Sequence, residues 1–89
     1  MKLGILGCGD FLRWQEEALK ASERVEVKAV YDPNRERAED WAERLGANAA
    51  RSEDEILTDP EIDIVALFVP PWLRKDLFLR AADHGKHVL

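Results

Sequence analysis

The chain has 89 residues, enough for one compact domain, because a single hydrophobic core usually organises about 100–200 residues. Its 13 basic and 18 acidic residues give a formal net charge of −5, which excludes the basic stripe that nucleic-acid binding requires. Cys8 is the only cysteine, so no intramolecular disulfide can form, and no apolar run is long enough to cross a membrane. We expect a cytoplasmic domain without nucleic-acid or membrane partners.

The first quarter of the chain predicts a buried strand, a glycine turn and a helix. Residues 2–6 form a short apolar run that ends at the turn made by residues 7–9. A helical pattern follows from Asp10, a candidate N-cap, to about residue 22. The residues expected on its apolar, core-facing side are Phe11, Trp14, Ala18 and Ala21.

The middle of the chain predicts a second strand, a second helix and a brief third strand. Residues 25–31 are rich in β-branched side chains, and Pro33 ends the strand that they predict. The helix that follows ends at Gly46, and its apolar residues recur with helical spacing: Ala38, Trp41, Ala42 and Leu45. Residues 48–50 are compatible with a brief third strand.

The last part of the chain predicts two more helices and two more strands. Ser52 and Glu55 have the spacing of a capping box and predict a short helix that ends at residue 57. Residues 62–69 are almost continuously apolar, which is typical of a strand covered on both faces. Gly85 ends a fourth helix, before a strand that begins at residues 87–89, and this helix is expected to bury Leu73, Leu77, Phe78 and Ala81.

Strands and helices thus alternate along residues 1–89 with short connections, which predicts a single domain. Such alternation indicates an α/β fold: a partial Rossmann-like, doubly wound parallel sheet in three layers, with helices on both faces. A ligand of this fold lies beyond the carboxyl ends of the strands that flank the topological switch point, here residues 2–6 and 62–69. The end of the strand at residues 62–69 and the residues just after it are expected to line the wall opposite the glycine turn. These residues are Val69, Pro70, Pro71 and Trp72. Trp72 either stacks on a ring of the ligand or covers apolar surface near the start of its helix.

The turn of residues 7–9 follows a buried strand and opens a helix, which is the context of a dinucleotide-binding fingerprint. Gly7 permits the tight turn, and Gly9 lets the backbone approach a pyrophosphate at the helix start. Leu12 occupies the third glycine position of the fingerprint, so we expect a slightly displaced helix and a weakened phosphate site. A pair of glycines also fits a simple strand-to-helix turn.

Asp32 ends the second strand, about twenty residues after Leu12, where the acid that binds an adenosine ribose is expected. Its carboxylate would accept both ribose hydroxyls and repel a 2′-phosphate, although an Asp before Pro33 also forms turns. Arg35 and Arg37 follow, and they either accommodate a 2′-phosphate or form an exposed helix face paired with Glu residues. NAD is therefore favoured over NADP.

The residues predicted to bind the cofactor are Gly7, Gly9, Asp10, Phe11, Leu12, Asp32, Arg37, Val69, Pro70, Pro71 and Trp72. No catalytic residue is predicted. No metal site is predicted either, because His84 and His87 with the distant Cys8 lack the spacing of a ligand set. Cys8 is either a reactive thiol at a helix start or a small filler between two glycines, and the second interpretation is favoured.

Four segments, in this order, resemble the amino-terminal domain of the Gfo/Idh/MocA oxidoreductases: GILGCGDF, VKAVYDPNRERAEDWAERLG, DPEIDIVALFVPP and AADHGKHVL. The resemblance covers nearly all of the chain. It implies an NAD- or NADP-binding domain of an enzyme that oxidises or reduces sugars, cyclitols or related polyols. In that family a second α/β domain holds the substrate, and a catalytic lysine lies in an E-K-P motif soon after the GKHV strand. The chain stops at Leu89, before such a motif, so the resemblance implies a domain that is not catalytic by itself.

Two positions depart from the pattern of this family and indicate a divergent branch. The family usually has Pro-Asn followed shortly by His after the long apolar strand, and Arg74 stands here in place of that His; Leu12 is the other departure. Two alternatives to a cofactor-binding portion of an oxidoreductase remain. One is a free-standing nucleotide-binding or sensing module. The other is a structural unit with a vestigial cofactor site, which would form a homodimer through the open edge of the strand that begins at His87.

Overall fold

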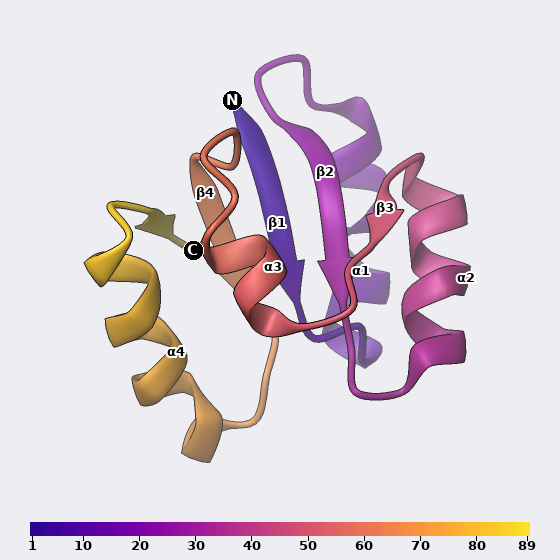
Figure 1. Ribbon diagram of the computed structural model, residues 1–89. Coiled ribbons are helices and arrows are strands. Elements are labelled where there is room, and N and C mark those ends of the chain that lie inside the picture. The colour runs from indigo at the N-terminus through magenta and orange to yellow at the C-terminus, as the bar shows by residue number, and fades with distance from the viewer.

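The computed structural model describes residues 1–89 except for the side chain of Phe11, so the predicted role of that side chain lies outside the described residues (Figure 1). Five strands alternate with four helices along the chain. The strands are β1 (Lys2–Leu6), β2 (Glu26–Tyr31), β3 (Asn48–Ala49), β4 (Ile64–Leu67) and β5 (His87–Val88). The helices are α1 (Asp10–Ala21), α2 (Arg35–Leu45), α3 (Glu53–Leu57) and α4 (Pro71–Asp83). The predicted order of elements is confirmed.

The sheet is parallel throughout and has the strand order β3-β2-β1-β4-β5. The chain therefore builds one half of the sheet outward from β1, then crosses to the other side of β1 and builds the second half. Helices α1 and α2 cover one face, and α3 and α4 cover the other (Figure 1). The predicted doubly wound, three-layer α/β fold is confirmed, with its switch point between β1 and β4.

The core consists of two apolar clusters, one on each face of the sheet. The cluster under α1 and α2 contains Leu3, Ile5, Cys8, Leu12, Val27, Val30, Trp41, Ala42 and Ala66. The cluster under α3 and α4 contains Leu6, Ala29, Ala50, Ile56, Leu57, Ile62, Val65, Leu67, Leu77 and Ala81. Both clusters use residues of β4, as expected of a strand that is covered on both faces.

The ends of the two middle helices are fixed by local hydrogen bonds. The side chain of Asn34 accepts a hydrogen bond from the backbone N–H of Arg37, which caps the start of α2. Ser52 does the same for the N–H of Glu55 at 3.2 Å, so the predicted cap of α3 is confirmed. Gly46 adopts the left-handed conformation with φ +65°, which ends α2 where the sequence predicted.

The prediction of which residues of α1 face the core is wrong for Trp14, Ala18 and Ala21. Leu12 is fully buried and Leu19 is partly buried, whereas Trp14 is 83% exposed and Ala18 and Ala21 are also exposed. The helix rotates its two leucines onto the sheet because branched aliphatic chains fill the core better than alanines. Glu16 then lies beside α2, where its carboxylate pairs with Arg44 at 2.7 Å.

Helix α4 buries a narrower face than its sequence predicted. Leu77 and Ala81 lie in the core, but Leu73 is 44% and Phe78 is 49% exposed. The reason is the position of α4 at the end of the sheet, where its main contacts are with β4 and the two-residue β5. Strand β4 is also shorter than predicted, although its neighbour Ile62 is buried in the core.

Among the residues that the structure describes, no helix is long and apolar enough to span a lipid bilayer.

Candidate functional site at the carboxyl edge of the sheet

Gly7 lies in a tightly packed turn between the ends of β2 and β4. Its N–H donates a hydrogen bond to the carbonyl of Tyr31 at 2.8 Å, and its φ of +99° is a conformation that L side chains rarely adopt. A Cβ atom at this position would lie 2.2 Å from the carbonyl oxygen of Phe68. The turn after β1 therefore requires glycine for both its backbone conformation and its packing.

Gly9 is the N-cap of α1 and faces open space. Among the atoms that the structure describes, an added Cβ atom would meet nothing within 4 Å, and no described side chain caps the start of this helix. Asp10 is exposed in the first turn of the helix. An uncapped helix start with room above it suits a negatively charged group, because free N–H groups and the helix dipole both favour an anion there.

Leu12 lies in the core and has no exposed surface. It packs in the same cluster as Leu3, Ile5, Trp41 and Ala66, so the third fingerprint position serves the contact between helix and sheet. The close helix–strand contact that a glycine allows is replaced here by a leucine that fills the space. The side chain of Leu12 is therefore not available to a ligand in the groove above the turn.

Asp32 connects the two loops that carry the predicted cofactor residues. Its Oδ2 accepts the backbone N–H of Cys8 at 2.9 Å, and its Oδ1 accepts the N–H of Asn34 at 2.8 Å. The carboxylate is partly exposed at the end of β2, beside the glycine turn. The turn-forming role is thus present, and it fixes the carboxylate beside the glycine turn.

A groove with a volume of about 540 Å³ opens between the starts of α1 and α2. It is lined by Cys8, Gly9, Asp10, Arg13, Asn34, Glu36, Arg37, Asp40, Trp41 and Arg44. The sequence does not distinguish the roles of Arg35 and Arg37, but the structure does. Arg35 pairs with Glu39 and donates hydrogen bonds to the carbonyls of Ala49 and Ala50. Arg37 lines the groove. Arg13 also lines it, a residue that the sequence pattern did not single out.

A second cleft, with a volume of about 460 Å³, lies at the end of β4. It is lined by Gln15, Leu67, Phe68, Val69, Arg74 and Leu89. Val69 also lies close to the Gly7 turn, since its Cγ1 would be 3.1 Å from a Cβ at Gly7. Pro70, Pro71 and the 79% exposed Trp72 follow as the exposed start of α4 and do not line this cleft.

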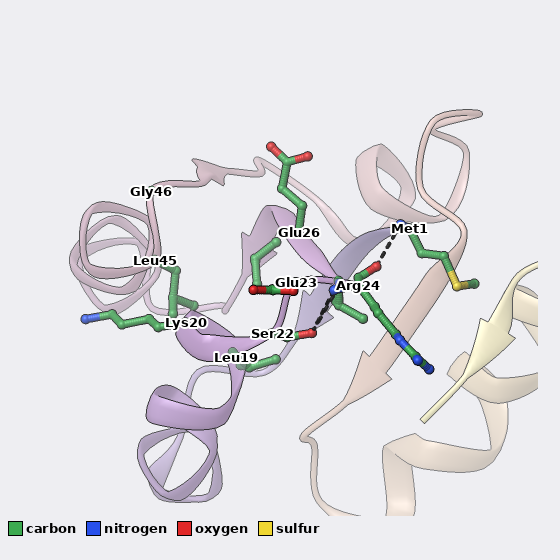
Figure 2. Close-up of a pocket in the computed structure, with 11 residues that line it drawn as sticks. Met1, Leu19, Lys20, Ser22, Glu23, Arg24, Glu26, Leu45 and Gly46 are labelled. Atoms are coloured by element: carbon green, nitrogen blue, oxygen red, sulfur yellow. Dashed lines mark hydrogen bonds between the residues drawn. The ribbon is translucent and has the colours of Figure 1, made fainter.

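A third cavity of about 470 Å³ lies at the opposite end of the sheet, near the starts of β1 and β2 (Figure 2). Its rim carries side chains of both charge signs, including Lys20, Glu23, Arg24 and Glu26 (Figure 2). The amino group of Met1 donates a hydrogen bond to the carbonyl of Arg24 at 2.9 Å. Ligands of doubly wound folds bind at the carboxyl ends of the strands, so this cavity is not the candidate cofactor site.

Cys8 is a filler and not an exposed nucleophile. Its side chain is 1% exposed, and its Sγ lies 3.7 Å from the carbonyl oxygen of Tyr31. Burial, and then the nearby Asp32 carboxylate, raises the pKa of the Cys8 thiol from 9.0 to about 12. The interpretation of Cys8 as a small filler between two glycines is confirmed.

We expect native Cys8 to react with an aromatic disulfide reagent at about pH 8 more than about a thousandfold more slowly than the unfolded chain. The thiolate is the reacting species, and the folded state suppresses it. The pKa of Cys8 is higher in the folded than in the unfolded chain, so the protonated thiol contributes to the free energy of unfolding. This contribution is complete below pH 9.0 and is lost as the pH rises toward about 12. The measurement is the release of chromophore with and without concentrated guanidinium chloride. Rapid release from the native chain would contradict the burial of Cys8.

The parallel sheet, the glycine turn and the acid at the end of β2 define a nucleotide-binding domain of the Rossmann type. Residues 1–89 match the family model described as "Oxidoreductase family, NAD-binding Rossmann fold", and the chain belongs to this family, Gfo/Idh/MocA. The resemblance predicted from the sequence is thereby confirmed, and so is the class of cofactor, a nicotinamide dinucleotide.

Individual relatives cover nearly the whole chain. An uncharacterized oxidoreductase of Streptococcus pneumoniae is 36% identical over 99% of this chain and 23% of its own length. Glucose-6-phosphate 3-dehydrogenase of Bacillus subtilis is 34% identical over 99% of this chain and 25% of its own length. A 3-ketoreductase of Actinomadura kijaniata, solved in complex with NADP and TDP-benzene, superimposes with a TM-score of 0.91 and 31% identity over 100% of this chain and 28% of its own. The chain thus spans about a quarter of the length of these relatives.

Proposed function

We propose that the groove between α1 and α2 holds the adenosine half of a nicotinamide dinucleotide, with the adenosine-side phosphate of its pyrophosphate over the start of α1. Three features support this placement: open space above Gly9, an uncapped helix start, and the carboxylate of Asp32 beside them. The nicotinamide half would then reach the cleft at the end of β4, next to Val69. The other predicted contacts, at Asp10, Phe11 and the start of α4, remain part of this proposal.

The observation that carries the proposal is the position of Asp32. The backbone N–H groups of Cys8 and Asn34 each occupy one of its oxygens and thereby fix the carboxylate at the edge of the groove. Each oxygen keeps a further lone-pair direction for a ribose hydroxyl. The same negative charge repels a 2′-phosphate, so we propose NAD as the preferred cofactor. Arg37, which lines the groove, is the residue that would let NADP bind as well.

We expect Asp32→Asn to weaken NADH binding by about tenfold to a hundredfold, because a charge-assisted hydrogen bond to the ribose is lost. NADPH binding should fall less or rise, because the repulsion of the 2′-phosphate is removed. The measurement is a titration of each reduced cofactor, followed by energy transfer from tryptophan to the nicotinamide ring.

Asp40→Asn is the matched control, because Asp40 lines the same groove on α2 and the substitution removes the same charge. We expect that variant to bind NADH within about twofold of the original chain, since an exposed charge has a small effect. A thermal melt of each variant checks that the fold is retained. Equal NADH affinity of Asp32→Asn and Asp40→Asn would contradict the proposed role of Asp32.

The activity that we propose for the whole protein is the oxidation or reduction of a sugar or related polyol. A bound nicotinamide dinucleotide supplies the hydride acceptor or donor for such a reaction. Two relatives support a sugar-like substrate by their names, glucose-6-phosphate 3-dehydrogenase and a 3-ketoreductase bound to TDP-benzene. These 89 residues bind and orient the cofactor in this proposal, and the parts that hold the substrate belong to the remaining length of such an enzyme.

The proposal keeps two further expectations from the sequence, a cytoplasmic location and a homodimer. The dimer is favoured by one observation: β5 is the last strand in the order of the sheet, and it consists of only two residues. Phe78 lies on α4, the helix that packs on β5, and is 49% exposed. An open strand edge next to exposed apolar side chains is a surface that proteins cover.

A further inference from the structure

The cleft at the end of β4 contains one charged side chain among mostly apolar ones. Leu67, Phe68, Val69 and Leu89 form most of its walls, Gln15 contributes an amide, and Arg74 is the only Lys, Arg, Asp or Glu among the lining residues that the structure describes. Its volume of about 460 Å³ lies within the range of sites for small molecules. The cleft therefore combines space for an apolar ring with a single fixed positive charge.

Arg74 has no protein partner in the part of the chain that the structure describes. The arginines that serve the fold do have partners: Arg44 pairs with Glu16 at 2.7 Å, and Arg80 pairs with Glu53 at 3.3 Å. Arg74, in contrast, is exposed at the mouth of the cleft and makes no ion pair or side-chain hydrogen bond with any described residue. Its guanidinium donors are free for an external acceptor.

The surroundings of Arg74 add to the positive potential of the cleft. The first turn of α4 contains no acidic residue, and Lys75 follows Arg74 directly. The helix dipole is positive at this end, so cations here are unfavourable for the helix. An anion held at Arg74 would relieve this repulsion, and a phosphate or carboxylate matches the two-pronged geometry of a guanidinium.

We propose that Arg74 binds the anionic group, a phosphate or a carboxylate, of the ligand that occupies the cleft at the end of β4. This inference rests on the proposed function, because the cleft lies where the nicotinamide half of the cofactor would reach. The anion has two sources with the same chemistry. It is either the nicotinamide-side phosphate of the cofactor's pyrophosphate, or an acidic group on the substrate that meets the nicotinamide half.

The test compares two ligands that differ by one phosphate, reduced nicotinamide mononucleotide and reduced nicotinamide riboside. We expect the 89-residue chain to bind the mononucleotide about fivefold to tenfold more tightly than the riboside. Arg74→Gln should reduce this ratio to about one, because glutamine keeps hydrogen-bonding ability and loses the charge. Binding is followed by the NMR shifts of the backbone amides of Phe68 and Val69, which line the cleft.

Lys75→Gln is the matched control, since it removes the neighbouring charge outside the cleft lining. We expect it to leave the ratio within about twofold of the original value. A second arm titrates inorganic phosphate and malonate. If the two nicotinamide ligands bind equally, but either anion shifts the Phe68 and Val69 amide signals in the original chain and not in Arg74→Gln, the anion comes from the substrate and the inference stands.

A ratio that persists in Arg74→Gln would overturn the inference, and so would the absence of any anion effect that depends on Arg74. The proposed function fails by a separate result, an NADH affinity that does not respond to Asp32→Asn. The two failures are distinguishable because Arg74 lines the cleft at the end of β4, whereas Asp32 does not line it and bonds instead to the N–H groups of Cys8 and Asn34.

Discussion

Replacing Gly7 by alanine is expected to destabilise the domain by more than about 3 kcal/mol, a large part of the roughly 4–13 kcal/mol expected for a chain of this size. Two causes act together. The φ of +99° costs an L residue about 1–2 kcal/mol or more, and the new Cβ would lie 2.2 Å from the oxygen and 2.7 Å from the carbon of the Phe68 carbonyl. Both contacts are with backbone, which cannot rotate away as a side chain can. Relief of the clash requires β4 to move away from β1.

The measurement is urea-induced unfolding, followed by far-ultraviolet circular dichroism, and Gly9→Ala is the control. Gly9 has φ −87°, and a Cβ there meets no atom within 4 Å, so we expect a change in unfolding free energy of less than about 1 kcal/mol. The same methyl group occupies the space proposed for the pyrophosphate, so NADH binding should weaken although the fold remains. If Gly7→Ala unfolds at the same urea concentration as Gly9→Ala, the packing of Gly7 against Phe68 is contradicted.

Restoring the missing fingerprint glycine, by Leu12→Gly, is expected to destabilise the domain by about 3–6 kcal/mol. Leu12 has no exposed surface and fills space between α1 and the sheet. Removing a buried leucine side chain usually costs about 2–5 kcal/mol, and glycine in a helix adds up to about 1 kcal/mol. A change that brings the sequence closer to the common dinucleotide-binding pattern should therefore damage this protein, because its core has been built around leucine.

Two variants of the same helix separate these contributions. Ala18→Gly places glycine at an exposed position of α1 and should cost about 1 kcal/mol, the helix term alone. Trp14→Ala removes a larger side chain that is 83% exposed and should change the unfolding free energy by less than about 0.5 kcal/mol. The measurement is again urea unfolding. A cost of Leu12→Gly no greater than that of Ala18→Gly would show that Leu12 is not a core residue.

The fold could be predicted from the sequence because its signals are local. The glycine turn at Gly7, the cap at Ser52 and the continuous apolar run around β4 each specify their own structure within a few residues. The side of a helix that faces the sheet is a different matter. In α1 the sequence offers two apolar sides, and only the packing against β1 and β2 selects Leu12 over Trp14.

In the candidate site, too, the local features could be predicted from the sequence and the tertiary contacts could not. Asp32 was located by its distance from the glycine turn, but its hydrogen bond to the N–H of Cys8 joins residues 24 positions apart and leaves no mark in the sequence. Arg35 and Arg37 look equivalent in the sequence. Tertiary contacts separate them, because the carbonyls of Ala49 and Ala50 accept hydrogen bonds from Arg35 and leave Arg37 to line the groove.

The position of Gly7 between the two halves of the sheet has a consequence for the order of folding. Its N–H bonds to Tyr31 of β2, while the wall on its other side is Phe68, after β4. Pairing of β1 with β2 closes a much shorter loop than pairing of β1 with β4, where Leu3 meets Ile64. Loop-closure entropy therefore favours the first pairing as the earlier event in refolding. The cleft at the end of β4 forms only when β1 pairs with β4. A ligand that spans both halves of the sheet therefore binds after this pairing and stabilises it.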